Sequence, residues 1–295
     1  MKKKEVCKID YLWIVLADIL MATDFSLNKV YQRKCGATPT AGYRFNLLSG
    51  ILKMLIFWAI NGFSIEITAY SSIMAAMMAF VCFCYILLGQ QILKVSQVTV
   101  YTLFLMLGGM CVPYVWGAVF LHEQLTAFRI IGLVVIAAAL ILMNLSERPP
   151  KKQILMCVAV FFLNGLCSVI SKEHQISANE TVSTSGFVML TGAATALFGL
   201  VGIIAERMKG HSSELISGGA GFCTVALSAV IGGASYLLQL LGAERIPATV
   251  LYPMLSGGSI ALSVLTGWVF FREKPAKKLW IGMVFCVIGT AMFIF

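Results

Sequence analysis

The feature that most constrains the fold is a succession of long apolar runs that recurs from one end of the chain to the other. A run of about 20 apolar residues is long enough to cross the hydrocarbon core of a bilayer as an α-helix. The runs do not alternate apolar and polar residues, as the strands of a membrane barrel do, so we predict helices. The ten runs cover residues 10–32, 39–60, 67–90, 95–120, 126–145, 153–172, 183–205, 216–242, 247–271 and 276–295.

Composition supports an all-α integral membrane protein. Of the 295 residues 59% are hydrophobic and 12% are charged, whereas soluble domains carry about 25% charged residues. So little polar surface cannot cover a water-soluble globule. The net charge of +9 lies in short loops and forms no basic stripe, which favours a lipid bilayer over nucleic acid as the partner.

The chain also repeats itself. When residues 97–145 are shifted by 150 positions without a gap, they match residues 247–295 with 11 identities in 49 positions. Glu123 falls on Glu273, and each of these acids ends a long apolar run nine residues before a matched glycine. A repeat of this kind constrains the whole fold.

The earlier spans of the two halves match more loosely, with residues 28–32 resembling residues 171–175. We therefore predict two copies of five helices, at residues 1–147 and 148–295, separated by a stretch rich in proline and charge. Because five is an odd number, the second copy must enter the membrane from the opposite side. The prediction is an inverted repeat, an arrangement that transporters use for alternating access around a central site.

Ten spans in two inverted halves, with Glu123 and Glu273 closing the fourth and ninth, resemble the drug/metabolite transporter superfamily, specifically its ten-helix EamA-type branch. That family often has glycine before the acid, where this chain has His122 and Arg272. The resemblance implies a secondary transporter with a central cavity lined by the first four helices of each half. It also implies that both termini lie in the cytoplasm.

Charge counting alone gives the other orientation. Seven lysines and arginines lie on the side of the N-terminus and twelve on the opposite side, which by the positive-inside rule places the termini outside. We adopt the orientation of the family, because an inverted repeat leaves only a small charge bias. The basic start at residues 1–4 precedes an apolar run that holds two acids and has no cleavage pattern, so we expect a retained first helix.

Asp18 is the first candidate for chemistry, because a carboxylate near the middle of a membrane span is costly. A buried carboxyl group can exchange a proton in the working pH range and couple proton flow to a substrate. The resemblance adds that small exporters of the same superfamily use a carboxylate of the first helix in this way. The alternative is a hydrogen bond to a neighbouring helix. Phe161 occupies the matching place in the second half, so the repeat gives Asp18 no support.

Asp24 is the second proton-coupling candidate, although we favour its pairing with Lys29, Lys53 or Arg44. Lys53 lies inside the second span, where it either reaches an interface or attracts an anionic substrate. Lys29 and Lys172 are repeat-related and allow the same two interpretations.

Polar and aromatic residues on the cavity helices are candidates for binding a solute by stacking and a few hydrogen bonds, with helix packing as the alternative for each. They are Lys53, Tyr85, Tyr101, Tyr114, Asn164, Tyr236, Gln239 and Tyr252. Glu123 and Glu273 are interpreted as structural acids that satisfy backbone groups or pair with cations.

No motif of an enzyme stands out. The zinc motif HExxH fails because Thr126 stands where its second histidine is required, and neither a phosphate-binding loop nor a nucleophile elbow is present. The nine cysteines form no CxxC pair, so we expect small packing residues and no metal site or cofactor.

Three functions stay open from the sequence. The first is a secondary transporter of the inner membrane that exports small metabolites or drug-like molecules, with proton coupling through Asp18. The second is an importer or exchanger of an anionic metabolite, with Lys53, Lys29 or Lys172 at its site. The third is a membrane scaffold without transport. We expect a small-molecule substrate and a monomer.

Overall fold

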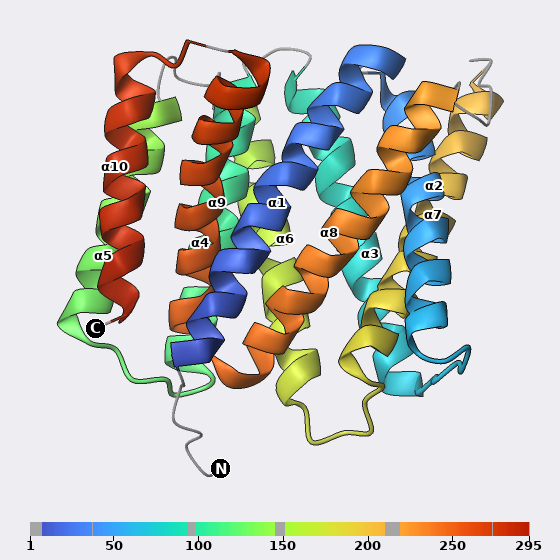
Figure 1. Ribbon diagram of the computed structural model, residues 1–295, viewed down its shortest axis with the longest axis horizontal. Coiled ribbons are helices and arrows are strands. Elements are labelled where there is room, and N and C mark those ends of the chain that lie inside the picture. The colour runs from blue at the N-terminus through green and yellow to red at the C-terminus, as the bar shows by residue number, and fades with distance from the viewer. Residues whose placement is uncertain are drawn as a thin grey trace. The chain divides into compact units, whose positions relative to one another are not determined.

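The computed structural model describes residues 8–36, 38–93, 98–144, 151–209, 219–272 and 274–294. Over these ranges the chain forms ten α-helices and one short 3-10 helix, and no strand (Figure 1). The predicted all-α fold is therefore confirmed. The helices are α1 (Lys8–Cys35), α2 (Pro39–Ile60), α3 (Ala69–Leu93), α4 (Val98–Val119), α5 (Ala127–Asn144), α6 (Lys151–Ile176), α7 (Thr184–Met208), α8 (Gly219–Arg245), α9 (Ala248–Phe271) and α10 (Lys277–Ala291), followed by η1 (Met292–Ile294).

Each of the ten α-helices is long and apolar enough to cross a membrane. The observed helices agree with the predicted spans to within a few residues at each end. The largest extension is at α6, which continues to Ile176 and so carries Lys172 and His174 inside a regular helix. The chain is a multi-pass membrane protein by the length and composition of its helices.

Local sequence explains where two of the helices begin. Thr38 precedes α2 in extended conformation and its hydroxyl accepts a hydrogen bond from the amide of Ala41 at 3.2 Å, while Pro39 takes the first helical position. Ser183 caps α7 in the same way, accepting from the amide of Gly186 at 3.1 Å. These side chains satisfy amides that a helix start leaves without an intrahelical acceptor.

The helices divide into two compact units, which are described separately below. The first unit is formed by Met1–Ala22, Val81–Ile176 and Leu238–Phe295, and the second by Thr23–Phe80 and Ser177–Leu237. Helices α1, α3 and α8 therefore contribute residues to both. The division of the sequence into repeats at residues 1–147 and 148–295 stays a prediction.

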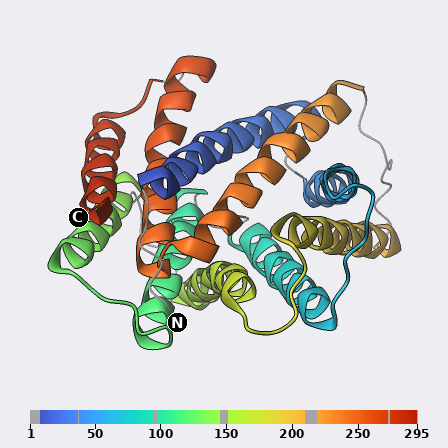
Figure 2. The ribbon, with the colours of Figure 1, turned by 60° about the horizontal axis from the view of Figure 1, so that its bottom comes forward.

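In the first unit α5 and α10 lie side by side, as two views show (Figure 1, Figure 2). A Cβ atom at Gly132 would meet the carbonyl oxygen of Gly289 at 2.9 Å, and one at Gly282 would overlap Met143 and approach the carbonyl oxygen of Ala139 at 3.4 Å. The repeat shift of 150 exchanges these two contacts, since it takes 132 to 282 and 139 to 289. The pairing is antiparallel and reciprocal.

In the second unit α2 and α7 make a contact of the same kind. A Cβ atom at Gly50 would meet the amide nitrogen of Ala196 at 2.6 Å, and one at Gly192 would meet the amide nitrogen of Met54 at 3.0 Å. A shift of 142 positions exchanges the two contacts. Glycine is required at both places because the two backbones touch.

Reciprocal contacts between antiparallel helices are the pattern that a two-fold axis lying across the helices produces. Both sets therefore support the inverted repeat, which itself remains a prediction.

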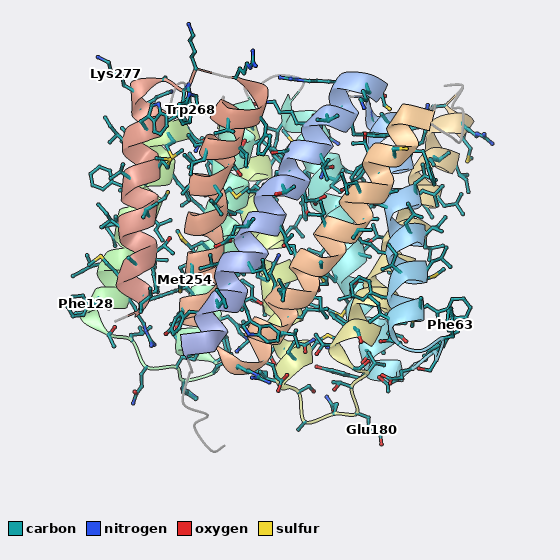
Figure 3. The ribbon with its side chains drawn as sticks, in the orientation of Figure 1. Phe63, Phe128, Glu180, Met254, Trp268 and Lys277 are labelled. Atoms are coloured by element: carbon teal, nitrogen blue, oxygen red, sulfur yellow. The ribbon has the colours of Figure 1, made fainter. Side chains whose placement is uncertain are left out.

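Two tryptophans pack together where α9 ends and α10 begins. Trp268, near the end of α9, packs edge to face on Trp280 of α10 with ring centroids 5.4 Å apart (Figure 3). Tryptophan is enriched at membrane–water interfaces, so this pair indicates the headgroup level for the two helices.

An exposed connection of the second unit carries one shifted titratable group. The Glu66 carboxylate, between α2 and α3, accepts a hydrogen bond from the amide of Ser183 at 2.8 Å. Hydrogen bonds from the backbone and side chain of Ser183 hold the pKa of Glu66 below its usual value. The contact ties the connection between α2 and α3 to the start of α7.

We expect Glu66→Gln to lower the thermal unfolding midpoint slightly at neutral pH. A carboxyl group whose pKa is lowered by folding stabilises the protein when it is ionised, and this contribution is lost as the pH falls through the folded-state pKa. The difference between wild type and variant should therefore be present at pH 7 and vanish in acid. Because Glu66 is exposed, the effect should stay below about 1 kcal/mol. The measurement is thermal unfolding in detergent at both pH values, with Glu180→Gln as control; an equal difference at both would contradict the prediction.

Candidate functional site

Asp18 is buried in the first unit without a full set of partners. It is 3% exposed, and its Oδ1 atom has no hydrogen-bond partner among the residues that the structure describes. Ile14 and Ala17, on the same helix, belong to the apolar core of the unit. A polar atom buried without a partner destabilises the folded protein. The presence of Asp18 at this position is therefore better explained by a function than by a contribution to stability.

Gly258 of α9 makes the space that Asp18 occupies. A Cβ atom at this position would overlap the Asp18 carboxylate. Gly258 is the repeat counterpart of Gly108 in α4, where a Cβ atom would overlap the backbone carbonyl of Phe161. Phe161 is the residue that matches Asp18 in the repeat. The two repeat-related glycines, Gly108 and Gly258, therefore contact two repeat-related positions, 161 and 18. Only position 18 carries a carboxylate.

Two tyrosines predicted as cavity residues belong to the same apolar core as Ile14 and Ala17. The hydroxyl of Tyr114 is buried with no partner among the described residues. The hydroxyl of Tyr252 donates to the carbonyl oxygen of Ser168 at 2.6 Å, which links α9 to α6. Tyr252 is therefore engaged in helix packing, whereas Tyr114 keeps hydrogen-bonding capacity.

The other polar candidates of the first unit contact neighbouring helices. The Asn164 side chain donates to the carbonyl oxygen of Leu105 at 2.7 Å, and Gln239 approaches the sulfur of Met21 at 3.7 Å. Tyr85 and Tyr101 pack together against the small core around Ile92, Val100, Cys157 and Val160.

In the second unit Asp24 is a contrast to Asp18, because its charge has partners. The Ser228 hydroxyl of α8 donates to Asp24 Oδ1, and the positive charge of Lys53 acts on the same carboxylate. Gly232 lies against this carboxylate as Gly258 lies against Asp18. The structure thus brings together two of the predicted residues, Asp24 and Lys53. The predicted residue Tyr236 approaches the sulfur of Met78 at 3.1 Å.

Glu123 and Lys172 hold the turn between α8 and α9 from its two sides. The Glu123 carboxylate accepts from the amides of Ala248 at 2.7 Å and Thr249 at 2.8 Å, at the start of α9. The Lys172 ammonium donates to the carbonyl oxygens of Ala243 at 2.6 Å and Ile246 at 2.7 Å, at the end of α8. Both charges complement the helix ends that they contact.

We expect Glu123→Ala to destabilise the protein by about 1–3 kcal/mol, because it removes two charge-assisted hydrogen bonds and leaves two amides of α9 without an acceptor. Glu123→Gln should cost less, since an amide oxygen can still accept one of the bonds. The measurement is thermal unfolding in detergent, with Gln124→Ala as an exposed neighbouring control. Equal unfolding midpoints for Glu123→Ala and wild type would refute the role.

The sequence predicted Asp18, Asp24, Lys53 and Glu123 as site residues, and Lys53 as one of three candidate partners of Asp24. It did not predict Ser228 beside Asp24 or Gly258 beside Asp18. Ser228 and Gly258 gave no separate signal as site residues, although the match of Gly108 with Gly258 marks where the helices of each half come close. Glu273, the repeat counterpart of Glu123, lies outside the described residues.

The fold and these contacts define a class: a multi-pass membrane protein with a buried acid on its first helix. Residues 151–295 match the EamA-like transporter family. Together with the relatives below, this match supports an EamA-type transporter of the drug/metabolite transporter superfamily, which confirms the resemblance found in the sequence. The names of the family and the relatives point to a transporter rather than an enzyme.

Three curated relatives illustrate the similarity. The spermidine export protein MdtI of Enterobacter sp. (strain 638) is 34% identical over 71 residues, which are 24% of this chain and 63% of that protein. MdtI of Yersinia pseudotuberculosis serotype I is 34% identical over 68 residues, 23% of this chain and 61% of the relative. An uncharacterized protein of Haemophilus influenzae is 24% identical over 182 residues, 59% of this chain and 58% of the relative. Each match thus covers less than two thirds of the relative's length.

A solved crystal structure has the same fold. It aligns with 97% of this chain and 96% of its own length at a TM-score of 0.77, with 17% sequence identity. At this identity the likeness concerns the fold alone.

Proposed function

We propose that this protein is a secondary active exporter of small organic molecules, working by alternating access and coupled to protons through Asp18. The observation that carries the proposal is the Asp18 carboxyl group, buried within a membrane-spanning helix with one oxygen unpartnered among the described residues. A group in such a place can exchange its proton when the surroundings open to water.

The relatives suggest a substrate class. MdtI is named for spermidine export, and spermidine is a small organic cation. A carboxylate favours an organic cation by charge, and proton release from Asp18 would create that charge when the cation binds. We therefore place small amines first among the candidate substrates, ahead of neutral drug-like molecules.

The alternative, an anion transporter with a lysine site, is less well supported. Lys53 interacts electrostatically with the Asp24 carboxyl group, and Lys172 donates to two backbone carbonyl oxygens. The double variant Asp24→Asn/Lys53→Gln separates the two cases, because it removes both charges together. It should keep transport if the pair is structural and abolish it if Lys53 binds an anion.

We further propose that the protein lies in the inner membrane as a monomer with both termini in the cytoplasm. The family resemblance supports this orientation. A C-terminal fusion to a reporter that is active only in the cytoplasm tests it, and an inactive reporter on a stably produced protein would contradict it.

The test of function is proton movement in proteoliposomes that contain a pH-sensitive dye. Spermidine, pooled amino acids, nucleosides and cationic drugs are added in turn to wild type, to Asp18→Asn and to Glu180→Gln. Glu180 is an exposed acid between α6 and α7 (Figure 3), so its variant serves as the control. We expect at least one pool to move protons with wild type and Glu180→Gln but not with Asp18→Asn. Solute flux without a proton signal would contradict coupling, and no saturable flux of any pool would favour a scaffold.

A further inference from the structure

Two cysteine thiols of the first unit lie against each other although they are 85 positions apart in the sequence. The sulfurs of Cys82 on α3 and Cys167 on α6 are 3.4 Å apart. Both are reduced thiols; Cys167 is buried and Cys82 is partly buried. Cys84, two positions along α3 and also partly buried, provides a natural comparison on the same helix.

The thiol pair borders the predicted cavity residues. Tyr85, one turn after Cys82 on α3, is hydrogen-bonded to that thiol. The ring of Tyr101 on α4 lies against Gly89 of α3, and Tyr101 packs on the same small core as Tyr85. A covalent change at this pair would therefore act directly on Tyr85, and on Tyr101 through the core that the two tyrosines share.

We propose that Cys82 and Cys167 are a redox modification site, which a thiol oxidant converts to a disulfide that ties α3 to α6. A disulfide needs an S–S distance of about 2.05 Å, so the sulfurs must approach by about 1.4 Å, within reach of side-chain rotation and a small helix shift. Two thiols held this close react as an intramolecular pair, at an effective concentration that no free thiol reaches.

The chemistry balances with an azodicarboxamide oxidant such as diamide. One thiolate adds to the N=N bond, and the second sulfur then attacks the first and displaces the reduced nitrogen group. Two S–H bonds break and one S–S bond forms. The two protons and two electrons pass to the oxidant, which becomes the corresponding hydrazine.

The consequence for transport rests on the proposed function. Helices α3 and α6 belong to different halves of the predicted repeat, and alternating access requires the halves to move against each other. A bond between these helices would hold the protein in one state. Oxidation of Cys82 and Cys167 would therefore lock the transporter and stop its cycle until the disulfide is reduced.

The site is tested by peptide mass spectrometry on the full-length protein in detergent. The protein is treated with diamide, its remaining thiols are alkylated, and the digest is compared between wild type, Cys82→Ser and the matched control Cys84→Ser. We expect a peptide pair that joins Cys82 to Cys167, lighter by two hydrogen atoms than the separate peptides, in wild type and Cys84→Ser only. It should disappear on reduction with dithiothreitol. Alkylation of both cysteines with no linked peptide would overturn the site.

The lock is tested by flux in proteoliposomes before and after diamide. Flux should fall in wild type and Cys84→Ser in proportion to the linked fraction, return with dithiothreitol, and stay constant in Cys82→Ser. Unchanged flux despite a complete link would overturn the lock. If untreated wild-type protein moves no solute, the proposed transport function is contradicted. The mass-spectrometric test of disulfide formation between Cys82 and Cys167 does not depend on that result.

Discussion

Asp18→Asn is expected to reduce transport driven by a pH gradient to the level of liposomes without protein. The amide has the shape of the carboxyl group but cannot release a proton, so the cycle loses its coupling step. The protein should nevertheless unfold at the same temperature as wild type or slightly higher, because the substitution removes a buried group that ionises at a desolvation cost. The measurements are gradient-driven flux and thermal unfolding of the same preparations.

The matched control is Asp24→Asn, the same change six positions along α1. Asp24 accepts a hydrogen bond from Ser228 and interacts electrostatically with Lys53, so its neutralisation weakens both interactions. We expect a loss of about 1–3 kcal/mol of stability for Asp24→Asn, because the hydrogen bond from Ser228 loses its charged acceptor. Wild-type gradient-driven flux in Asp18→Asn would show that Asp18 is structural and that another group couples transport.

Gly258→Ala is expected to impair transport about ten- to hundred-fold while the protein still folds. The added methyl group overlaps the Asp18 carboxylate, so the carboxylate must leave the position that it occupies in wild type. Displacement of a functional group by about 1 Å can cost a hundred-fold in rate, whereas an extra methyl group in a packed core costs about 1–3 kcal/mol in stability. Flux should therefore fall by one to two orders of magnitude, while the unfolding midpoint falls by only a few degrees or less.

Two comparisons isolate this effect. Gly42→Ala, in the first turn of α2 with nothing within 4 Å of an added Cβ atom, should change neither flux nor unfolding appreciably. In an Asp18→Ala background, where the clash no longer exists, Gly258→Ala should cost little additional stability. A Gly258→Ala protein with the flux and pH dependence of wild type would refute the positioning role of the glycine.

Much of the fold could be predicted because a bilayer leaves few choices. Backbone groups in lipid must bond within their own segment, so the apolar runs had to be helices, and their length set the ends within a few residues. The reciprocal contacts of Gly132 with Gly289 and of Gly282 with Ala139 agree with the sequence repeat, although spacing alone could not show which helices would touch. Contacts of this kind depend on the packing of whole helices.

The candidate site could be predicted only in part. An acid inside an apolar run is visible in any sequence, which is why Asp18 and Asp24 were found. What distinguishes them lies on α8 and α9, more than 200 positions away: a hydroxyl at Ser228 for Asp24, and a glycine at 258 with no hydrogen-bonding side chain for Asp18. The contact of Cys82 with Cys167 likewise depends on how α3 meets α6. No local pattern encodes these pairs.

Exchange of a solute for protons is measured most directly as the internal pH of proteoliposomes while the wild-type protein moves spermidine. If transport is coupled to protons, spermidine accumulates against its gradient when a pH gradient is imposed. Internal pH then changes in step with the solute, and a protonophore abolishes both. Spermidine flux that proceeds at the same rate without a pH gradient, and with no change in internal pH, would contradict proton coupling and identify the protein as a facilitator.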